Sequence, residues 1–166
     1  MTREVLKNVS LLKKYNQEYI INYSDYPSKD CWSYDMTGLD YKNALCDVYQ
    51  NNDNLSSLLY VHTPFCEQIC YFCFCSTFIT QDYDKVKRYL DDYLLKELRL
   101  LREEINSNGL KPNIRQIYLG GGSPTYYREN EFVELISAIK ELVDINDIDT
   151  FTVEIDPHRV DKEKLE

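Results

Sequence analysis

Apolar residues recur at strand and helix spacings in a regular order over most of the chain. Residues 58–62, 114–119 and 150–155 are short, largely apolar runs typical of buried strands. Residues 83–105 and 132–143 lie between them and carry apolar side chains at the spacing of an amphipathic helix. The order strand, helix, strand, helix, strand predicts parallel strands joined by right-handed crossovers, which is an α/β fold.

Side chains alternate between the two faces of each predicted strand. One set is apolar and should pack under the helices: Leu59, Val61, Ile117, Leu119, Val153 and Ile155. The other set is more polar and should face the interior of a barrel: Tyr60, His62, Gln116, Tyr118 and Glu154. A carboxylate such as Glu154 loses hydration there unless it meets a partner, so we expect a bound polar ligand beside it. The alternative is a strand end where Glu154 contacts water.

The N-terminal part of the chain has a different pattern. Helical spacing predicts short helices over residues 5–15 and 37–49, and the aromatic-rich residues 16–36 between them predict an ordered loop. We therefore expect an N-terminal arm with helices over residues 1–54, followed by an α/β core over residues 55–166.

Composition and charge limit the class of protein. The chain has 166 residues, of which 43% are hydrophobic and 28% are charged, an ordinary globular balance. Its net charge of -9 argues against partners held through phosphates, whether nucleic acid or an anionic membrane surface. No apolar run approaches the ~20 residues of a membrane span, and the start lacks a signal peptide's apolar core. These features predict a cytoplasmic protein, in which Cys31 and Cys46 would be free thiols.

Four of the six cysteines, Cys66, Cys70, Cys73 and Cys75, lie within ten residues. Thiolates this close repel one another unless a cation holds them, so a metal centre is expected. A structural zinc site usually combines two separate cysteine pairs, and no second pair or spaced histidine follows here. Gaps of three and two residues instead suit one loop around a four-iron cluster with one iron left open. A zinc-binding structural module remains the alternative.

The predicted topology brings several motifs together. The carboxyl ends of parallel strands lie at one edge of a sheet. The cysteines follow the first strand, Gly120, Gly121 and Gly122 follow the second, and Asp156 closes the third. We expect one site at this edge, with the glycine amides approaching a ligand. A plain tight turn is the alternative for the glycines.

The cysteine spacing C-x3-C-x2-C resembles the signature of the radical S-adenosylmethionine (SAM) superfamily. The longer string over residues 60–75, YVHTPFCEQICYFCFC, resembles the oxygen-independent coproporphyrinogen III dehydrogenase (oxidase) family. Two later motifs, LGGGSPT at residues 119–125 and VEIDP at residues 153–157, stand in that family's order. The resemblance implies the N-terminal part of a partial TIM-type (β/α) barrel. We therefore expect the chain to be a fragment, inactive alone.

The resemblance also implies roles for individual residues. Cys66, Cys70 and Cys73 would ligate a [4Fe-4S] cluster. Cys75 would be the enzyme branch's fourth cysteine, not a ligand, and no other catalytic residue is assigned. The implied SAM contacts are Tyr60, Phe72, Gly121, Gly122, Ser123 and Glu154.

The reaction implied by the resemblance is oxidative decarboxylation in haem biosynthesis. A carbon radical derived from SAM would remove hydrogen from propionate groups of coproporphyrinogen III, and loss of carbon dioxide would give the vinyl groups of protoporphyrinogen IX. An electron donor such as flavodoxin or ferredoxin would reduce the cluster. Asn22 stands where the family usually has arginine, and Phe74 where it has glycine. A SAM-dependent methyltransferase and a haem chaperone are the alternative functions.

Overall fold

The computed structural model describes residues 33–52, 55–160 and 162. The helix expected over residues 5–15, the N-terminal part of the arm and Cys31 lie outside these residues. Contacts divide the chain into two units, Met1–Gly38 and Leu39–Glu166. The expected arm and core boundary at residue 54 stays a prediction. Among the described helices, none combines the length and apolar character that crossing a membrane requires.

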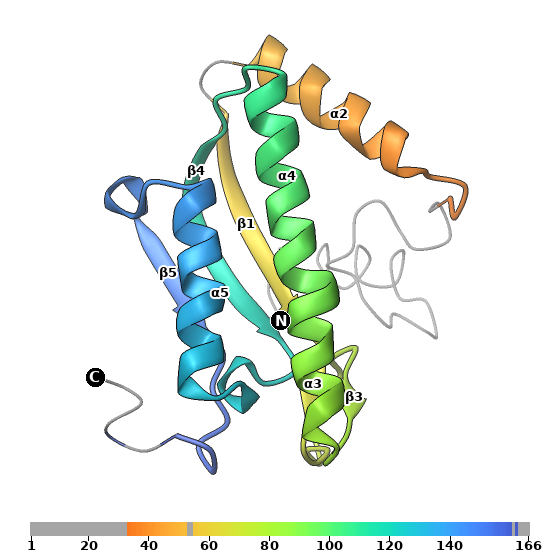
Figure 1. Ribbon diagram of the computed structural model, residues 1–166, viewed down its shortest axis with the longest axis vertical. Coiled ribbons are helices and arrows are strands. Elements are labelled where there is room, and N and C mark those ends of the chain that lie inside the picture. The colour runs from red at the N-terminus through yellow and green to blue at the C-terminus, as the bar shows by residue number, and fades with distance from the viewer. Residues whose placement is uncertain (1–32, 53–54, 161, 163–166) are drawn as a thin grey trace, which may run out of the picture. The chain divides into compact units, whose positions relative to one another are not determined.

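A three-stranded parallel sheet forms the centre of the second unit (Figure 1). Its strands are β1 (Ser56–Thr63), β4 (Asn113–Gly121) and β5 (Thr150–Val153), in the order β1-β4-β5. All three were predicted, and both pairings are parallel as expected. The central strand β4 ends on the glycines, so its carboxyl end lies between those of β1 and β5.

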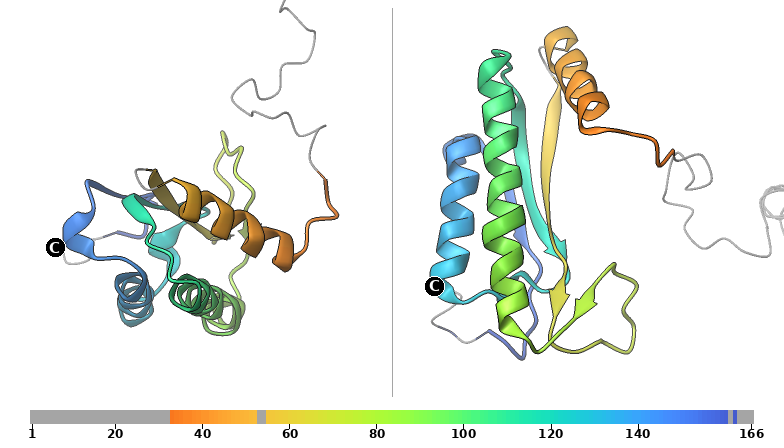
Figure 2. Two further views of the ribbon diagram at one scale, coloured as in Figure 1. Left: turned by 90° about the horizontal axis from the view of Figure 1, so that it is seen from above. Right: turned by 45° about the vertical axis from the view of Figure 1, so that its right-hand side comes forward.

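The helices that connect the strands lie on one face of this sheet (Figure 2). After β1 the chain forms one long helix made of α3 (Tyr83–Tyr89), a π-helical turn η2 (Leu90–Leu94) and α4 (Leu95–Ser107). The crossover from β4 to β5 is α5 (Glu129–Leu142). Both confirm the predicted helices and crossovers.

Five smaller elements are also described. Helix α2 (Gly38–Asn51) was predicted; Lys42 on it forms a salt bridge of 2.7 Å with Glu104 on α4. Short 3-10 helices, η3 (Pro124–Tyr126) and η4 (Ile145–Asp147), flank α5. Two short strands, β2 (Phe65–Cys66) and β3 (Phe78–Ile79), pair beside the cysteines and were not predicted.

The π-helical turn follows from the spacing of the buried residues. Val86, Leu90, Leu94 and Leu98 are all buried and lie four residues apart. In an ideal α-helix each four-residue step rotates the side chain by roughly 40° beyond a full turn, so such a row drifts off one face. A wider turn at Leu90–Leu94 takes up part of that drift. The long helix therefore keeps all four residues toward the sheet.

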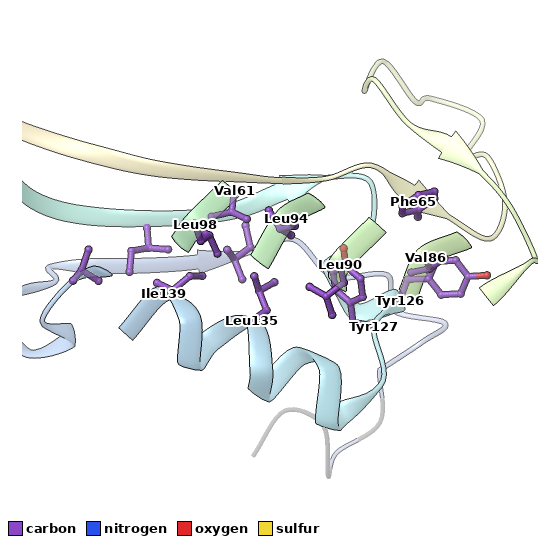
Figure 3. Packing of buried hydrophobic residues seen from close by; sticks show 13 residues of the cluster. Val61, Phe65, Val86, Leu90, Leu94, Leu98, Tyr126, Tyr127, Leu135 and Ile139 are labelled. Carbon is purple, nitrogen blue, oxygen red and sulfur yellow. The ribbon is translucent and has the colours of Figure 1, made fainter. Parts of the chain in front are cut away.

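The core lies between the sheet and these helices (Figure 3). Val61, Ile117 and Leu119 on the strands are buried, and they pack in one cluster with Leu135 and Ile139 of α5. The predicted alternation of faces is thus confirmed over the strands. It is wrong for Ile155, which is 50% exposed because β5 ends two residues earlier.

Candidate functional site

The glycine loop (residues 120–123) forms backbone hydrogen bonds with residues 63–65, which lead into the cysteine loop (residues 66–77). The Gly122 amide donates to the Thr63 carbonyl at 2.7 Å, and the Ser123 amide donates to the Phe65 carbonyl at 2.9 Å. A Cβ atom on Gly122 would lie 2.6 Å from the Thr63 oxygen and 2.7 Å from the Phe65 oxygen. Glycine is required here because two backbones approach this closely. The motifs after β1 and β4 therefore form one unit, as predicted.

The two ends of the cysteine loop are held together at its base. Strands β2 and β3 pair Phe65 with Phe78 and Cys66 with Ile79. The Thr80 amide donates to the Cys66 carbonyl at 2.9 Å, and within the loop the Cys73 amide donates to the Cys70 carbonyl at 3.1 Å. All four thiols are thus on one closed loop at the carboxyl edge of the sheet.

The electrostatic environment of the thiols fits anionic ligands of a cationic centre. Burial, together with the negative charges of nearby Cys73 and Cys70, raises the pKa of Cys66 to about 11. Thiolates that disfavour one another in this way are stabilised when iron binds them. Cys66, Cys70 and Cys73 therefore suit a shared iron–sulfur cluster.

The described residues do not contain three or more His, Cys, Asp or Glu side chains placed to hold a single metal ion. This gives the zinc alternative no support. In a four-iron cluster each thiolate binds a different iron, so the ligands lie farther apart than those around one ion.

Cys75 interacts electrostatically with Glu154 and Tyr60, which were predicted to face the barrel interior. Burial raises the pKa of its thiol, and the negative charges of Cys73 and Glu154 add to the effect. The Cys75 thiol also contributes to the raised pKa of Tyr60, after burial and Glu154. This cysteine therefore lies near two of the predicted SAM contacts, which suits a role beside the cluster.

Glu154 has protein partners. Its carboxylate accepts a hydrogen bond from the Tyr118 hydroxyl at 2.7 Å and another from the Gly121 amide at 3.1 Å. A bound ligand is therefore not needed to offset the hydration that this carboxylate loses. Tyr118 was placed on the correct face by the alternation, but its pairing with Glu154 was not foreseen.

The backbone amides of the glycine loop are also engaged within the chain. Gly121 donates to Glu154, Gly122 to Thr63 and Ser123 to Phe65. The Ser123 hydroxyl lies 2.9 Å from the Thr125 hydroxyl. The expected use of these amides as a ligand cradle must therefore be revised: in this geometry they join the glycine loop to its neighbours.

Tyr60 and His62 form a hydrogen-bonded pair on the face opposite the helices. The Tyr60 hydroxyl lies 3.0 Å from Nδ1 of His62, and Nε2 of His62 lies 3.0 Å from the Ser76 carbonyl. A carbonyl only accepts, so Nε2 carries the proton and, in the neutral ring, Nδ1 accepts from Tyr60. From sequence, His62 was expected only to face the barrel interior, yet it connects Tyr60, a predicted SAM contact, to the end of the cysteine loop.

Phe72 lies on the exposed side of the cysteine loop and is 80% exposed. It shares this exposure with three other large apolar side chains, which are Ile69, Tyr71 and Phe74. The loop is therefore held in shape by polar and backbone contacts at its ends more than by burial.

Comparison with known proteins identifies the family of this site. The model of the radical SAM superfamily matches residues 60–166, well over half of the chain. A protein of Mannheimia haemolytica named oxygen-independent coproporphyrinogen III oxidase is 32% identical over 154 residues, covering 93% of this chain and 99% of that protein. The chain belongs to the oxygen-independent coproporphyrinogen III oxidase family of the radical SAM superfamily.

Other members of this family are longer than the matched region. A Helicobacter pylori protein of the same name is 35% identical and is covered over 28% of its length. A Cereibacter sphaeroides protein named coproporphyrinogen III oxidase, anaerobic 1, is 32% identical and is covered over 34%. The chain thus spans about a third or less of these two relatives.

A solved structure confirms the partial barrel fold. The coproporphyrinogen III oxidase HemN of Escherichia coli, described as a radical SAM enzyme, matches with a TM-score of 0.67 and 27% identity. The match covers 92% of this chain and 31% of that one. The cofactors of this superfamily are a [4Fe-4S] cluster and SAM, and the three-cysteine loop fits the first of them.

Proposed function

We propose that the chain carries the cluster and SAM site for oxygen-independent conversion of coproporphyrinogen III to protoporphyrinogen IX. The observation that supports this most is the junction of the cysteine loop and the glycine loop. Two backbone hydrogen bonds fix the loop with Cys66, Cys70 and Cys73 against the loop with Gly121 and Gly122. A cofactor contacting both loops would be held in a defined orientation.

The chain's own residues divide this work. Cys66, Cys70 and Cys73 would hold a [4Fe-4S] cluster, which together with SAM supplies the one-electron chemistry that side chains lack. The other SAM contacts proposed on the family motif are Tyr60, Phe72, Gly121, Gly122, Ser123 and Glu154. Tyr118 fixes the Glu154 carboxylate, while His62 fixes the Tyr60 hydroxyl. Cys75 would stay free beside the cluster.

The substrate and the electron donor are part of the proposal. The names of the relatives support a porphyrinogen, and reduction of the cluster calls for a donor such as flavodoxin or ferredoxin. A cytoplasmic location without nucleic acid or membrane partners is proposed from the net charge of -9 and the reducing conditions that free thiols need. The arm over residues 1–54 and the core over residues 55–166 remain our proposed division.

Anaerobic reconstitution with iron and sulfide tests the cofactor site. We expect the visible absorption of an iron–sulfur cluster and, with reductant and SAM, release of methionine and 5'-deoxyadenosine. Cys66→Ala, Cys70→Ala and Cys73→Ala should each abolish both signals, whereas Cys46→Ala on α2 should not. Cys75→Ser should keep the cluster absorption. Full cluster content in any of the three ligand variants would contradict the assignment.

A further inference from the structure

A group of three side chains joins the cysteine loop to the segment after β5. The Arg159 guanidinium forms an ion pair with Glu67 and lies 4.8 Å from the centre of the Tyr126 ring. We call Glu67, Tyr126 and Arg159 the loop clamp. Its members come from the cysteine loop, the 3-10 helix η3 and the segment that follows β5.

Tyr126 extends the clamp to the other end of the cysteine loop. Its ring is buried and its hydroxyl donates to the Thr80 carbonyl at 2.8 Å. Glu67 directly follows the first cysteine, and Thr80 follows strand β3. Arg159 and Tyr126 together therefore contact both ends of the loop, one end through Glu67 and the other through Thr80.

Glu67 is the only charged residue between positions 66 and 77. The large apolar side chains of that segment, Ile69, Tyr71, Phe72 and Phe74, are exposed, so burial contributes little to its order. An ion pair between partly exposed groups is weak when isolated, but a planar guanidinium stacked on a buried ring is already oriented for its carboxylate. The clamp thus adds to the backbone and polar contacts that order a loop with little buried apolar surface.

We propose that Arg159 is a positioning residue that holds residues 66–70 of the cysteine loop in the shape required for cluster binding. This inference rests on the proposed cluster site. It assigns a role to Arg159, which lies outside all three sequence motifs. Groups that orient metal ligands commonly affect metal affinity by about 10- to 100-fold.

The test compares reconstituted wild type with Arg159→Gln and Glu67→Gln. Iron release to a chelator is followed anaerobically, and we expect each variant to lose iron about tenfold faster than wild type. Limited proteolysis within residues 66–77 of the iron-free proteins should accelerate in both variants. The matched control is Arg115→Gln, because Arg115 pairs with Asp149 at 2.6 Å near the other end of β4. The control should behave as wild type in both measurements.

Two double variants separate positioning from general damage. Arg159→Gln combined with Glu67→Gln should lose iron no faster than Arg159→Gln alone, since the arginine variant already removes the ion pair with Glu67. Arg159→Glu combined with Glu67→Arg should recover much of the retention because the ion pair is restored in reverse. If circular dichroism shows that Arg159→Gln is unfolded, the role of the clamp is judged from Glu67→Gln alone, since Glu67 lies on the loop surface.

The outcomes distinguish the inference from the proposed function. Wild-type retention and wild-type proteolysis in Glu67→Gln and Arg159→Gln would overturn the role of the clamp and leave the cluster site intact. Strictly additive losses in the double variant would also overturn it. A wild-type chain that takes up no cluster would overturn the proposed function itself, whatever the proteolysis of the loop shows.

Discussion

Gly121 and Gly122 are required by different neighbours. Gly122 is limited by the backbone of residues 63–65, whereas Gly121 has a positive φ of 104° and would place a Cβ 2.2 Å from the His62 ring. Sequence showed three equivalent glycines and suggested one shared use for them. The structure separates their roles because each faces a different part of the β1 end.

Substituting Gly122 with alanine should separate the glycine and cysteine loops. The added Cβ would meet two carbonyl oxygens that cannot move independently, so we expect a loss of ~1–3 kcal/mol in unfolding free energy. Cluster uptake should fall with it. Chemical denaturation measures the first and iron analysis the second. Gly38→Ala is the control, since nothing lies within 4 Å of that position; equal stability of the two variants would contradict the argument.

Replacing His62 with phenylalanine should release the end of the cysteine loop. An aromatic ring is kept, but the bonds to Tyr60 and to the Ser76 carbonyl are lost, at ~1 kcal/mol for a typical hydrogen bond. We expect faster proteolysis near Ser76. Gly121→Ala should produce the same cleavage pattern, because its Cβ displaces the His62 ring. Unchanged cleavage in both variants would show that His62 does not hold the loop.

At the scale of elements, the long helix after β1 shows what periodicity can and cannot predict. The apolar stripe over residues 83–105 predicted its position and its buried face. It did not predict the π-helical turn at Leu90–Leu94. An apolar stripe is compatible with both a continuous α-helix and a helix with a π-helical turn, and only the packing partners decide between them. The sequence feature that indicates the π-helical turn is the regular four-residue spacing of apolar residues from Val86 to Leu98.

Leu90→Ala should destabilise the whole second unit. Leu90 is fully buried at the start of the wide turn, so the substitution leaves a cavity against the sheet. We expect a loss of ~2–5 kcal/mol in unfolding free energy, measured by denaturant titration. Leu100→Ala on the same long helix is the matched control, because Leu100 is 49% exposed. A similar loss in both variants would argue against tight packing at the turn.

The contact between α2 and α4 should weaken in acid. The hydrogen bond from Lys42 lowers the pKa of Glu104 below its ordinary value of 4.5, and their Coulomb attraction adds to this. The contact therefore contributes fully above pH 4.5 and is lost as the pH falls through the lowered pKa. Hydrogen exchange of α2, corrected for intrinsic rates, should accelerate at that point.

Glu104→Gln should show the same fast exchange of α2 already at neutral pH, with little further change in acid. Glu103→Gln is the control, because Glu103 pairs with Arg99 within α4 rather than with α2. If the hydrogen-exchange rate of α2 changes neither with pH nor in Glu104→Gln, other contacts hold this helix.

For the whole molecule, sequence predicted the order of elements and the meeting of the cysteine and glycine motifs at one edge. These features follow from the alternation of strands and helices along the chain, which the spacing of apolar residues in a single sequence indicates. The Glu154–Tyr118 bond, the His62–Ser76 contact and the loop clamp could not be predicted in this way. Each joins residues separated along the chain and depends on side-chain packing, for which the sequence carries no local signal.

The arrangement of the sheet also predicts what the isolated chain does. Helices α4 and α5 lie on one face, while Tyr60, predicted on the other face, is 50% exposed and Gln116 on the adjacent strand is also exposed. Within the described residues, water therefore reaches the side where the substrate would react, and radical chemistry requires its exclusion. We expect the 166-residue chain to take up a cluster but not to convert coproporphyrinogen III, as judged by product analysis with SAM and reductant. Conversion by the chain alone at the rate of the longer relatives would show that this open face is covered in solution.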